Sequence, residues 1–340
     1  MTKSSGTILD GESRPEGRGT GTAPRNVPRA SRRLVLRAGV SAAIGLAAGR
    51  VPLGRAADAL PLIEKPIPSS KQMLPVVGLG TNNFDVGDPA EIAARKEVLR
   101  GMPELGGSVV DTAPLYGRSE AVIGAIVADL GNRNRLFLAT KVMSRDSDGS
   151  DGKASIEESF RRLRSEHIDL MQVHNLAGVD QMIPVLQDLK KSKRIRYFGI
   201  TTSNPAQHPQ MMEFMRRYPL DFIQVDYSLD NREVATSVLP LAQERKIGVL
   251  VNTPFGGRRG AASVFGRVAN KPLPDWAAEI DAQSWAQVLL KYVVAHPAVT
   301  CALSGTTQVK HLDDNQRGAR GRLPDAALRA RMEKYWDSLA

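Results

Sequence analysis

Residues 155–174 read SIEESFRRLRSEHIDLMQVH, and this stretch decides the fold that the sequence predicts. Its first half places apolar residues at helical spacing among charged ones, which predicts an amphipathic helix over about 154–165. Its second half, IDLMQVH, is an apolar run that ends on His174. A run with so little alternation is typical of a strand covered on both faces, as in a parallel sheet. The stretch therefore predicts a helix followed by a buried strand with a polar side chain at its end.

The same unit recurs along the chain from Leu74 onward. Eight short apolar runs predict strands: PVVGLG, GSVVD, RLFLATKV, IDLMQVH, IRYFGIT, FIQVD, IGVLVN and VTCALSG. Amphipathic segments follow them, at roughly 90–104, 119–130, 154–165, 178–192, 205–217, 231–245, 282–295 and 308–317. Eight strands, each followed by a helix, predict a single α/β domain, a (β/α)8 TIM barrel. Two dinucleotide-binding halves are the alternative, but GLGTNNFD lacks the G-x-G-x-x-G spacing that they require.

The distribution of charge argues against a nucleic-acid partner. The net charge is +10, but residues 1–59 hold ten Lys/Arg against four Asp/Glu and so contribute +6 of it. The remaining +4 leaves little basic surplus for a polyanion. The single cysteine, Cys301, lies in a predicted buried strand, so we expect a small core residue and no disulfide or thiolate metal site within the chain.

Residues 1–59 have the layout of an export leader. A Gly-, Ser- and Arg-rich stretch predicts disorder up to residue 30, and Arg32-Arg33 then precedes an apolar run over 38–49. That run is shorter than the ~20 residues of a membrane span, and Ala57-Asp58-Ala59 offers a cleavage site after Ala59. The arginine pair resembles a twin-arginine signal peptide, which predicts the twin-arginine export machinery as a partner and a periplasmic location. A basic amphipathic helix packed on the fold or on a membrane is the alternative. The predicted organisation is thus a leader over 1–59 and a barrel over 60–340.

The carboxyl ends of the strands carry the active site in barrels of this type. The residues at the predicted strand ends are polar or small: Gly80-Thr81, Asp111, Lys141, His174, Thr201-Thr202, Gln224, Asn252-Thr253 and Ser304-Gly305. Each one alone would fit a helix cap, a solvated side chain or a hydrogen-bonded core residue. An Asp, a Lys and a His at three successive strand ends would point into the same opening of the barrel. Three such residues in one place rarely occur by chance, and they predict a catalytic site.

The chemistry of these side chains suits the reduction of a carbonyl group. Tyr116 follows Asp111 by five residues, and a phenol has an ordinary pKa of about 10. The ammonium of Lys141, held by Asp111, would favour the phenolate and bring the pKa of Tyr116 closer to working pH. A neutral His174 could donate a hydrogen bond to a carbonyl oxygen. The set delivers a proton to oxygen without a nucleophile or a metal, as hydride transfer to a carbonyl carbon requires.

The motifs of the chain resemble those of the aldo-keto reductase superfamily across about 75–318. They are VGLGT, DTAPLYGRSEAVIG, LATKV, SIEESFRRLRSEHIDLMQVH, IRYFGIT, IQVDYS and SGTTQVKHLDDN, in the family's order and spacing. The resemblance implies a (β/α)8 barrel with NADPH extended across the strand ends. It implies a catalytic tetrad of Asp111, Tyr116, Lys141 and His174, with Tyr116 as the general acid. The implied activity is NAD(P)H-dependent reduction of an aldehyde or ketone to an alcohol.

The resemblance also implies contacts with the cofactor. Gln224 is expected to hydrogen-bond the nicotinamide carboxamide, and Asp314 and Asn315 to contact the adenine end. Together with the strand ends, the expected cofactor-binding residues are Gly80, Thr81, Thr201, Thr202, Gln224, Asn252, Thr253, Phe255, Gly256, Ser304, Gly305, Thr306, Gln308, Asp314 and Asn315.

Two departures from the family pattern concern the nicotinamide. The family's Ser-Asn pair, which holds the carboxamide, aligns with Thr201-Thr202, while Ser203-Asn204 follows two residues later, so either pair could take this role. The family's tyrosine that stacks on the nicotinamide aligns with Asn252, and Phe255 could replace it.

Two further departures concern the substrate and the 2′-phosphate. Asn175-Leu176 stands where many relatives place a tryptophan of the substrate pocket. His311 stands where the family often has an arginine for the 2′-phosphate, and Gln308, Lys310 or Arg258-Arg259 could replace it, so NADH stays open beside NADPH. These departures leave a second function open, because the potassium-channel β-subunits of the superfamily keep the tetrad yet serve as cofactor-sensing modules with little turnover.

Overall fold

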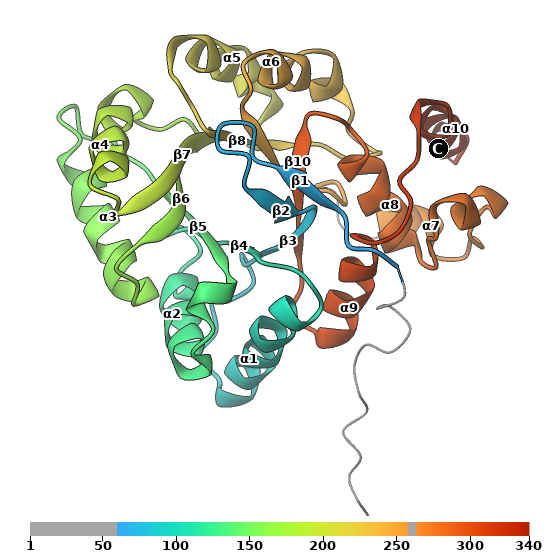
Figure 1. Ribbon diagram of the computed structural model, residues 1–340, viewed down its shortest axis with the longest axis horizontal. Coiled ribbons are helices and arrows are strands. Elements are labelled where there is room, and N and C mark those ends of the chain that lie inside the picture. Colours follow the sequence, from blue (N-terminus) through green and yellow to red (C-terminus); the bar gives the residue numbers. More distant parts are fainter. Residues whose placement is uncertain (1–59, 258–262, 340) are drawn as a thin grey trace, which may run out of the picture. The chain divides into compact units, whose positions relative to one another are not determined.

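Eight parallel strands close into a barrel in the order β10-β3-β4-β5-β6-β7-β8-β9 (Figure 1). The computed structural model describes residues 60–257 and 263–339, so the predicted leader and Arg258-Arg259 lie outside the described residues. The barrel strands are β3 (Val77–Gly80), β4 (Val109–Asp111), β5 (Phe137–Val142), β6 (Ile168–His174), β7 (Ile195–Thr201), β8 (Phe222–Asp226), β9 (Gly248–Asn252) and β10 (Val299–Gly305). The predicted (β/α)8 fold is confirmed.

Helices follow the strands and surround the barrel (Figure 1). They are α1 (Pro89–Glu104), α2 (Ser119–Leu130), α3 (Ser150–Leu163), α4 (Val179–Lys191), α5 (His208–Arg217), α6 (Val238–Glu244), α8 (Trp285–Val294) and α9 (Val309–Arg317). Two others, α7 (Val264–Val268) and α10 (Ala326–Asp337), lie in the connection after β9 and near the carboxyl terminus. Short 3-10 turns occur at η2 (Arg133–Arg135), η3 (Pro205–Gln207), η4 (Glu233–Thr236) and η6 (Asp275–Ile280). None of the described helices is long and apolar enough to span a membrane.

Three of the predicted helices differ from the observed ones. The helix expected over 205–217 starts with the 3-10 turn η3, and α5 begins at His208. The helix expected from residue 154 begins at Ser150, because the polar residues before it form the first helical turn, where the acidic Asp151 is favourable. The helix expected over 231–245 is divided into η4 and α6 by Ser237, whose backbone angles (φ −136°, ψ −75°) are not helical.

A hairpin that the sequence analysis did not predict closes the amino-terminal end of the barrel. Its strands are β1 (Glu64–Pro66) and β2 (Met73–Pro75), which pair antiparallel. Ile67 and Leu74 of this segment are 0% and 1% exposed and belong to the core cluster inside the barrel. The hairpin gave no clear sequence signal, because its strands have only three residues each and both end in proline.

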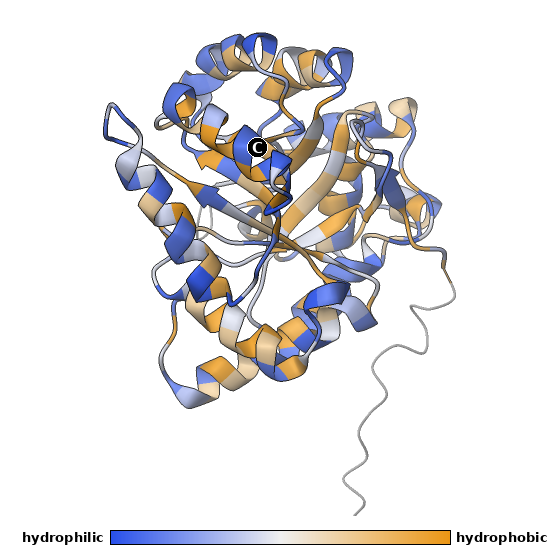
Figure 2. Cartoon of the chain, turned by 60° about the vertical axis from the view of Figure 1, so that its left-hand side comes forward, coloured by the Kyte–Doolittle hydropathy of each residue, from blue (hydrophilic) through white to orange (hydrophobic). Residues whose placement is uncertain are grey.

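The apolar core has two layers. Figure 2 shows apolar residues on the strands and on the helices around them. The larger layer lies between the strands and the helices. The smaller layer fills the lower barrel with Val109, Phe137, Ala139, Leu170, Tyr197, Phe222, Leu250, Cys301 and Leu303 above the hairpin residues. Burial raises the pKa of the Cys301 thiol, so this cysteine is a core residue, as the sequence predicted, and not a nucleophile.

Helices α2 and α3 approach each other closely at Gly124. A Cβ atom at Gly124 would overlap the main-chain oxygen of Arg162 and lie 2.8 Å from Cα of Leu163. Because these are main-chain atoms, a side chain at this position would force the two helices apart.

The Gly124→Ala substitution should therefore lower the free energy of unfolding by about 1–3 kcal/mol, the usual cost of overpacking. Urea denaturation of the full chain measures this change. Gly101→Ala in α1 is the matched control, because its Cβ would meet only the Leu312 side chain, at 3.4 Å, and alanine favours a helix over glycine by about 1 kcal/mol. Equal destabilisation by both substitutions would contradict the explanation.

Candidate active site

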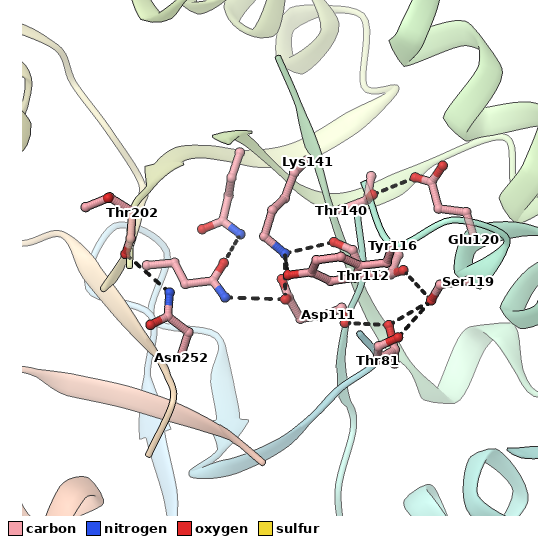
Figure 3. Close-up of polar contacts among 12 residues, drawn as sticks. Thr81, Asp111, Thr112, Tyr116, Ser119, Glu120, Thr140, Lys141, Thr202 and Asn252 are labelled. Carbon is pink, nitrogen blue, oxygen red and sulfur yellow. Dashed lines mark hydrogen bonds and ion pairs between the residues drawn. The ribbon is translucent and has the colours of Figure 1, made fainter. Parts of the chain in front are cut away.

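Lys141 lies at the centre of a polar cluster at the carboxyl ends of the strands (Figure 3). Its Nζ donates hydrogen bonds to Asp111 Oδ2 at 2.7 Å and to the main-chain oxygen of Thr112 at 2.9 Å. The same Nζ lies 3.4 Å from the Tyr116 hydroxyl. Lys141 is 1% and Asp111 2% exposed. The ammonium group is thus held beside the phenol oxygen, away from water.

His174, at the end of β6, borders the phenol. The rings of Tyr116 and His174 have centroids 6.1 Å apart and stand at 86° to each other. Burial, and after it the charge of Lys141, lower the pKa of His174 to about 3. Its Nδ1 is buried and has no hydrogen-bond partner among the described residues. The imidazole is therefore neutral at physiological pH.

The phenol of Tyr116 keeps its proton at neutral pH. Burial raises the pKa of Tyr116, the charge of Lys141 lowers it, and the charge of Asp111 raises it again, with a net upward shift. The sequence analysis expected Lys141 to bring this pKa down. That direction is wrong for the structure described here, because the phenol is buried deeply enough for desolvation to outweigh the ammonium.

Lys141 keeps its charge in this environment. Burial by itself would lower the pKa of Lys141, but the charges and hydrogen bonds of Asp111 and Tyr116 outweigh burial and raise it. The carboxylate and the phenol oxygen therefore hold a full positive charge at the bottom of the site.

A layer of buried hydroxyl groups supports the loop that carries Tyr116 (Figure 3). Ser119 Oγ lies 2.9 Å from Thr112 Oγ1, 3.1 Å from Thr81 Oγ1 and 3.0 Å from the main-chain oxygen of Thr81. Thr81 Oγ1 in turn donates to the main-chain oxygen of Asp111 at 2.9 Å. All three hydroxyl side chains are 0% exposed. The network ties the end of β3 to both ends of the Tyr116 loop.

Two buried glutamines extend the polar cluster across the barrel. Gln224 Nε2 donates to Asp111 Oδ2 at 3.3 Å, and Gln172 Nε2 donates to Gln224 Oε1 at 2.9 Å. The sequence analysis missed Gln172, although a glutamine inside the apolar run IDLMQVH was a signal that could have identified it. Its Oε1 is buried without a partner among the described residues.

A cavity of about 380 Å³ opens beside these residues, and we call it the main cavity. All four residues of the predicted tetrad line it. Nine of the fifteen residues predicted to bind the cofactor also line it: Gly80, Thr81, Thr201, Gln224, Asn252, Thr253, Phe255, Gly256 and Gly305. Of the two pairs considered for the carboxamide, Thr201 and Ser203 line the cavity, so neither pair faces it as a unit.

The other six predicted residues do not line the main cavity: Thr202, Ser304, Thr306, Gln308, Asp314 and Asn315. The side chains of several of these residues form hydrogen bonds with other residues of the protein. Thr202 Oγ1 donates to Gln207 Oε1 at 2.5 Å, and Ser304 Oγ donates to the main-chain oxygen of Gly78. Asp314 accepts hydrogen bonds from Ser284 Oγ and Gln287 Nε2 at the start of α8. Their contacts with a cofactor stay predictions.

Residues that the sequence analysis did not predict complete the lining. Asn82, Pro254 and Leu303 are among them. Asn82 follows Gly80-Thr81 at the end of β3, so its position in the sequence could have predicted that it lines the cavity. Leu303 is apolar and lies within a strand, so nothing in the sequence predicted its place in the lining. Among the residues that the structure describes, no group of three or more His, Cys, Asp or Glu side chains is placed to hold a metal ion.

Comparison with known proteins gives a consistent result. The family model described as Aldo/keto reductase family matches residues 76–334. The Bacillus subtilis protein named "Uncharacterized oxidoreductase YqkF" is 27% identical over 292 residues, which cover 72% of this chain and 90% of that protein. The Escherichia coli protein named "Methylglyoxal reductase YeaE" is 28% identical over 266 residues, which cover 75% of this chain and 89% of that protein.

Solved structures of similar proteins share the fold. The holo form of an aldo-keto reductase from Bacillus halodurans has a TM-score of 0.63 at 25% identity and covers 82% of this chain and 97% of its own. A Klebsiella pneumoniae aldo-keto reductase in complex with NADPH has a TM-score of 0.66 at 21% identity and covers 81% of this chain and 96% of its own. The family model thus matches most of the described residues, and the observed barrel agrees with it. The chain belongs to the aldo/keto reductase family and is an NAD(P)H-dependent oxidoreductase.

Proposed function

We propose that this enzyme reduces a small aldehyde or ketone to an alcohol with NADPH, and that Tyr116 is the general acid. One observation carries the proposal: the protonated phenol lies 3.4 Å from the buried Lys141 ammonium and at the edge of the neutral His174 ring. The relative named a methylglyoxal reductase and the neighbour solved with NADPH support the substrate class and the cofactor.

The main cavity fits a flat nicotinamide ring. Gly80 and Gly305 face each other across β3 and β10, where a Cβ on Gly80 would lie 3.9 Å from the Gly305 backbone, so the floor is free of side chains. Asn252 Oδ1 is buried there without a partner among the described residues and can accept a hydrogen bond from a carboxamide N–H. Phe255 offers an apolar wall and packs on Phe265 with ring centroids 5.0 Å apart. A reduced nicotinamide bound in this place would supply the hydride.

The residues of the chain supply the proton and bind the oxygen. Tyr116 donates its proton to the carbonyl oxygen as that oxygen becomes an alkoxide, and the alcohol forms. Lys141 stabilises the phenolate that remains, and Asp111 keeps the ammonium in place. His174, which is neutral and lines the main cavity, can donate a hydrogen bond that orients the carbonyl without adding a charge.

Removing the phenol hydroxyl tests the role of Tyr116. Tyr116→Phe should lower kcat/KM for a simple aldehyde by about 10²–10⁴-fold, the usual contribution of a general acid, while the Kd for NADPH changes little. NADPH oxidation and a fluorescence titration of NADPH measure the two quantities. Tyr218→Phe is the matched control, because its hydroxyl bonds Asp180 outside the site. Tight NADPH binding without turnover in the unmodified chain would instead favour a cofactor-sensing module.

The pH dependence of the rate tests the protonation states. Reduction needs the phenol protonated, and the pKa of Tyr116 is raised, so kcat/KM should fall only as the pH rises past about 10. His174, with a pKa of about 3, should stay neutral down to acidic pH. The profile should therefore be flat between about pH 5 and 9. A break near pH 6.5, the ordinary value for histidine, that disappears in His174→Ala would contradict the neutral imidazole.

We also propose that residues 1–59 direct the folded protein through twin-arginine export to the periplasm. The support is the sequence alone, since these residues lie outside the described ones. Replacing Arg32 and Arg33 with lysines should move the protein from the periplasmic to the cytoplasmic fraction of a Gram-negative host. Arg14→Lys with Arg18→Lys is the control, and the same distribution for both variants would count against the leader.

A further inference from the structure

A second cavity of about 220 Å³ adjoins the tetrad, and we call it the side cavity. Lys141 and His174 line both cavities, so the side cavity borders two residues of the tetrad. The main cavity extends from there over β7 to β10 and β3, whereas the side cavity extends over β5 and α3. A substrate whose carbonyl lies at Tyr116 and His174 can therefore extend into the side cavity without displacing a ligand of the main cavity.

The walls of the side cavity are apolar near the tetrad. Pro114 and Leu115 come from the loop before Tyr116, and Val142 and Met143 come from the end of β5. Leu115 is 55% exposed and is one of the few large apolar side chains on the described surface. These walls suit a short hydrocarbon chain attached to the carbonyl carbon.

Arg145, whose side chain is exposed, also lines the side cavity and brings an unpaired charge. Its guanidinium makes no hydrogen bond or ion pair with any residue that the structure describes, whereas most other described arginines do. An arginine cannot lose its charge in a protein, and its five N–H donors match a carboxylate in two-point contact. The group is thus available to an anion in the cavity.

Asp151, the acidic residue in the same wall, does not occupy Arg145. Its Oδ2 accepts the main-chain N–H of Arg145 at 2.8 Å, and its Oδ1 accepts Ser144 Oγ at 2.5 Å and the Gly152 N–H at 2.8 Å. These hydrogen bonds, the one from Ser144 foremost, lower the pKa of Asp151 to about 2. The carboxylate therefore turns both oxygens to its own loop and anchors the main chain of Arg145. Lys141, the other cation in the wall, is committed to Asp111.

We propose that Arg145 makes the enzyme selective for short carbonyl compounds that carry a carboxylate at the far end of the molecule. The carbonyl lies at Tyr116 and His174, the hydrocarbon chain lies between the apolar walls, and the carboxylate binds the Arg145 guanidinium. The length of the substrate is limited to a few carbons, because the side cavity is smaller than the ~300–1,000 Å³ of sites for drug-sized ligands. The inference rests on the proposed carbonyl reduction and adds the substrate class to it.

A matched pair of substrates tests the role of Arg145. We would measure kcat and KM with NADPH for 4-oxobutanoate and for butanal, which share the aldehyde and the chain length and differ in the carboxylate. Arg145→Met in the full chain should lower kcat/KM for 4-oxobutanoate about 10- to 100-fold, the value of a hydrogen bond to a charged group, mainly through KM. The value for butanal should not change. Arg145→Lys should retain part of the preference, since it keeps the charge but loses the planar fork.

Arg216→Met is the control for a general loss of positive charge. Arg216 is exposed on α5, and its guanidinium also makes no contact with any described residue. If Arg145→Met leaves the ratio of the two kcat/KM values unchanged, or if Arg216→Met changes it equally, the inference is wrong while the reductase assignment stands. If the unmodified chain reduces neither aldehyde, the proposed function fails first, and the inference fails with it.

Discussion

Lys141 and Asp111 form an ion pair that is almost fully shielded from water, and placing charges there costs several kcal/mol per ion before any compensation. The compensation comes from close hydrogen bonds to Asp111 and to the main chain of Thr112. A buried charge of this kind tolerates little movement, because each ångström of separation weakens the attraction that offsets desolvation. The closed barrel provides the required rigidity, since β4 and β5 are hydrogen-bonded to each other and to a neighbour on their other side. Burial keeps the phenol of Tyr116 protonated although this charge favours the phenolate, and burial and the charge together keep the imidazole of His174 neutral.

The barrel interior is divided into an apolar lower part and a polar upper part. Phe137, Leu170 and Phe222 fill the lower part above the hairpin. Gln172 and Gln224 lie higher on β6 and β8 and connect to Asp111. Because successive side chains of a strand point alternately into the barrel and toward the helices, Leu170 and Gln172 occupy successive inward levels of β6, the first apolar and the second polar. Inward positions near the start of a strand can be purely hydrophobic, while those near its end are available for polar contacts.

The fold and the polar cluster at the strand ends could be predicted because both depend on short-range sequence patterns. Eight apolar runs separated by amphipathic segments predict the barrel, and Asp111, Lys141 and His174 mark the ends of three successive strands. Features that depend on contacts between distant parts of the chain could not be predicted from such patterns. The hairpin under the barrel has strands too short for a period, and Thr202 turns its hydroxyl to Gln207 although it sits next to Thr201, which lines the cavity. The direction in which the pKa of Tyr116 shifts depends on how deeply the phenol is buried, and no local sequence pattern predicts this burial.

Apart from Lys141 and His174, which line both cavities, the main cavity and the side cavity are lined by different residues. Two of the residues that line the side cavity, Met143 and Arg145, come from the connection between β5 and α3, and this connection contributes nothing to the hydroxyl layer under Tyr116. Substitutions or insertions in that connection can accumulate without disturbing the buried ion pair. The walls of the side cavity and the buried ion pair therefore depend on largely separate contacts, so the shape of the side cavity can change while Lys141 and Asp111 keep their hydrogen bond.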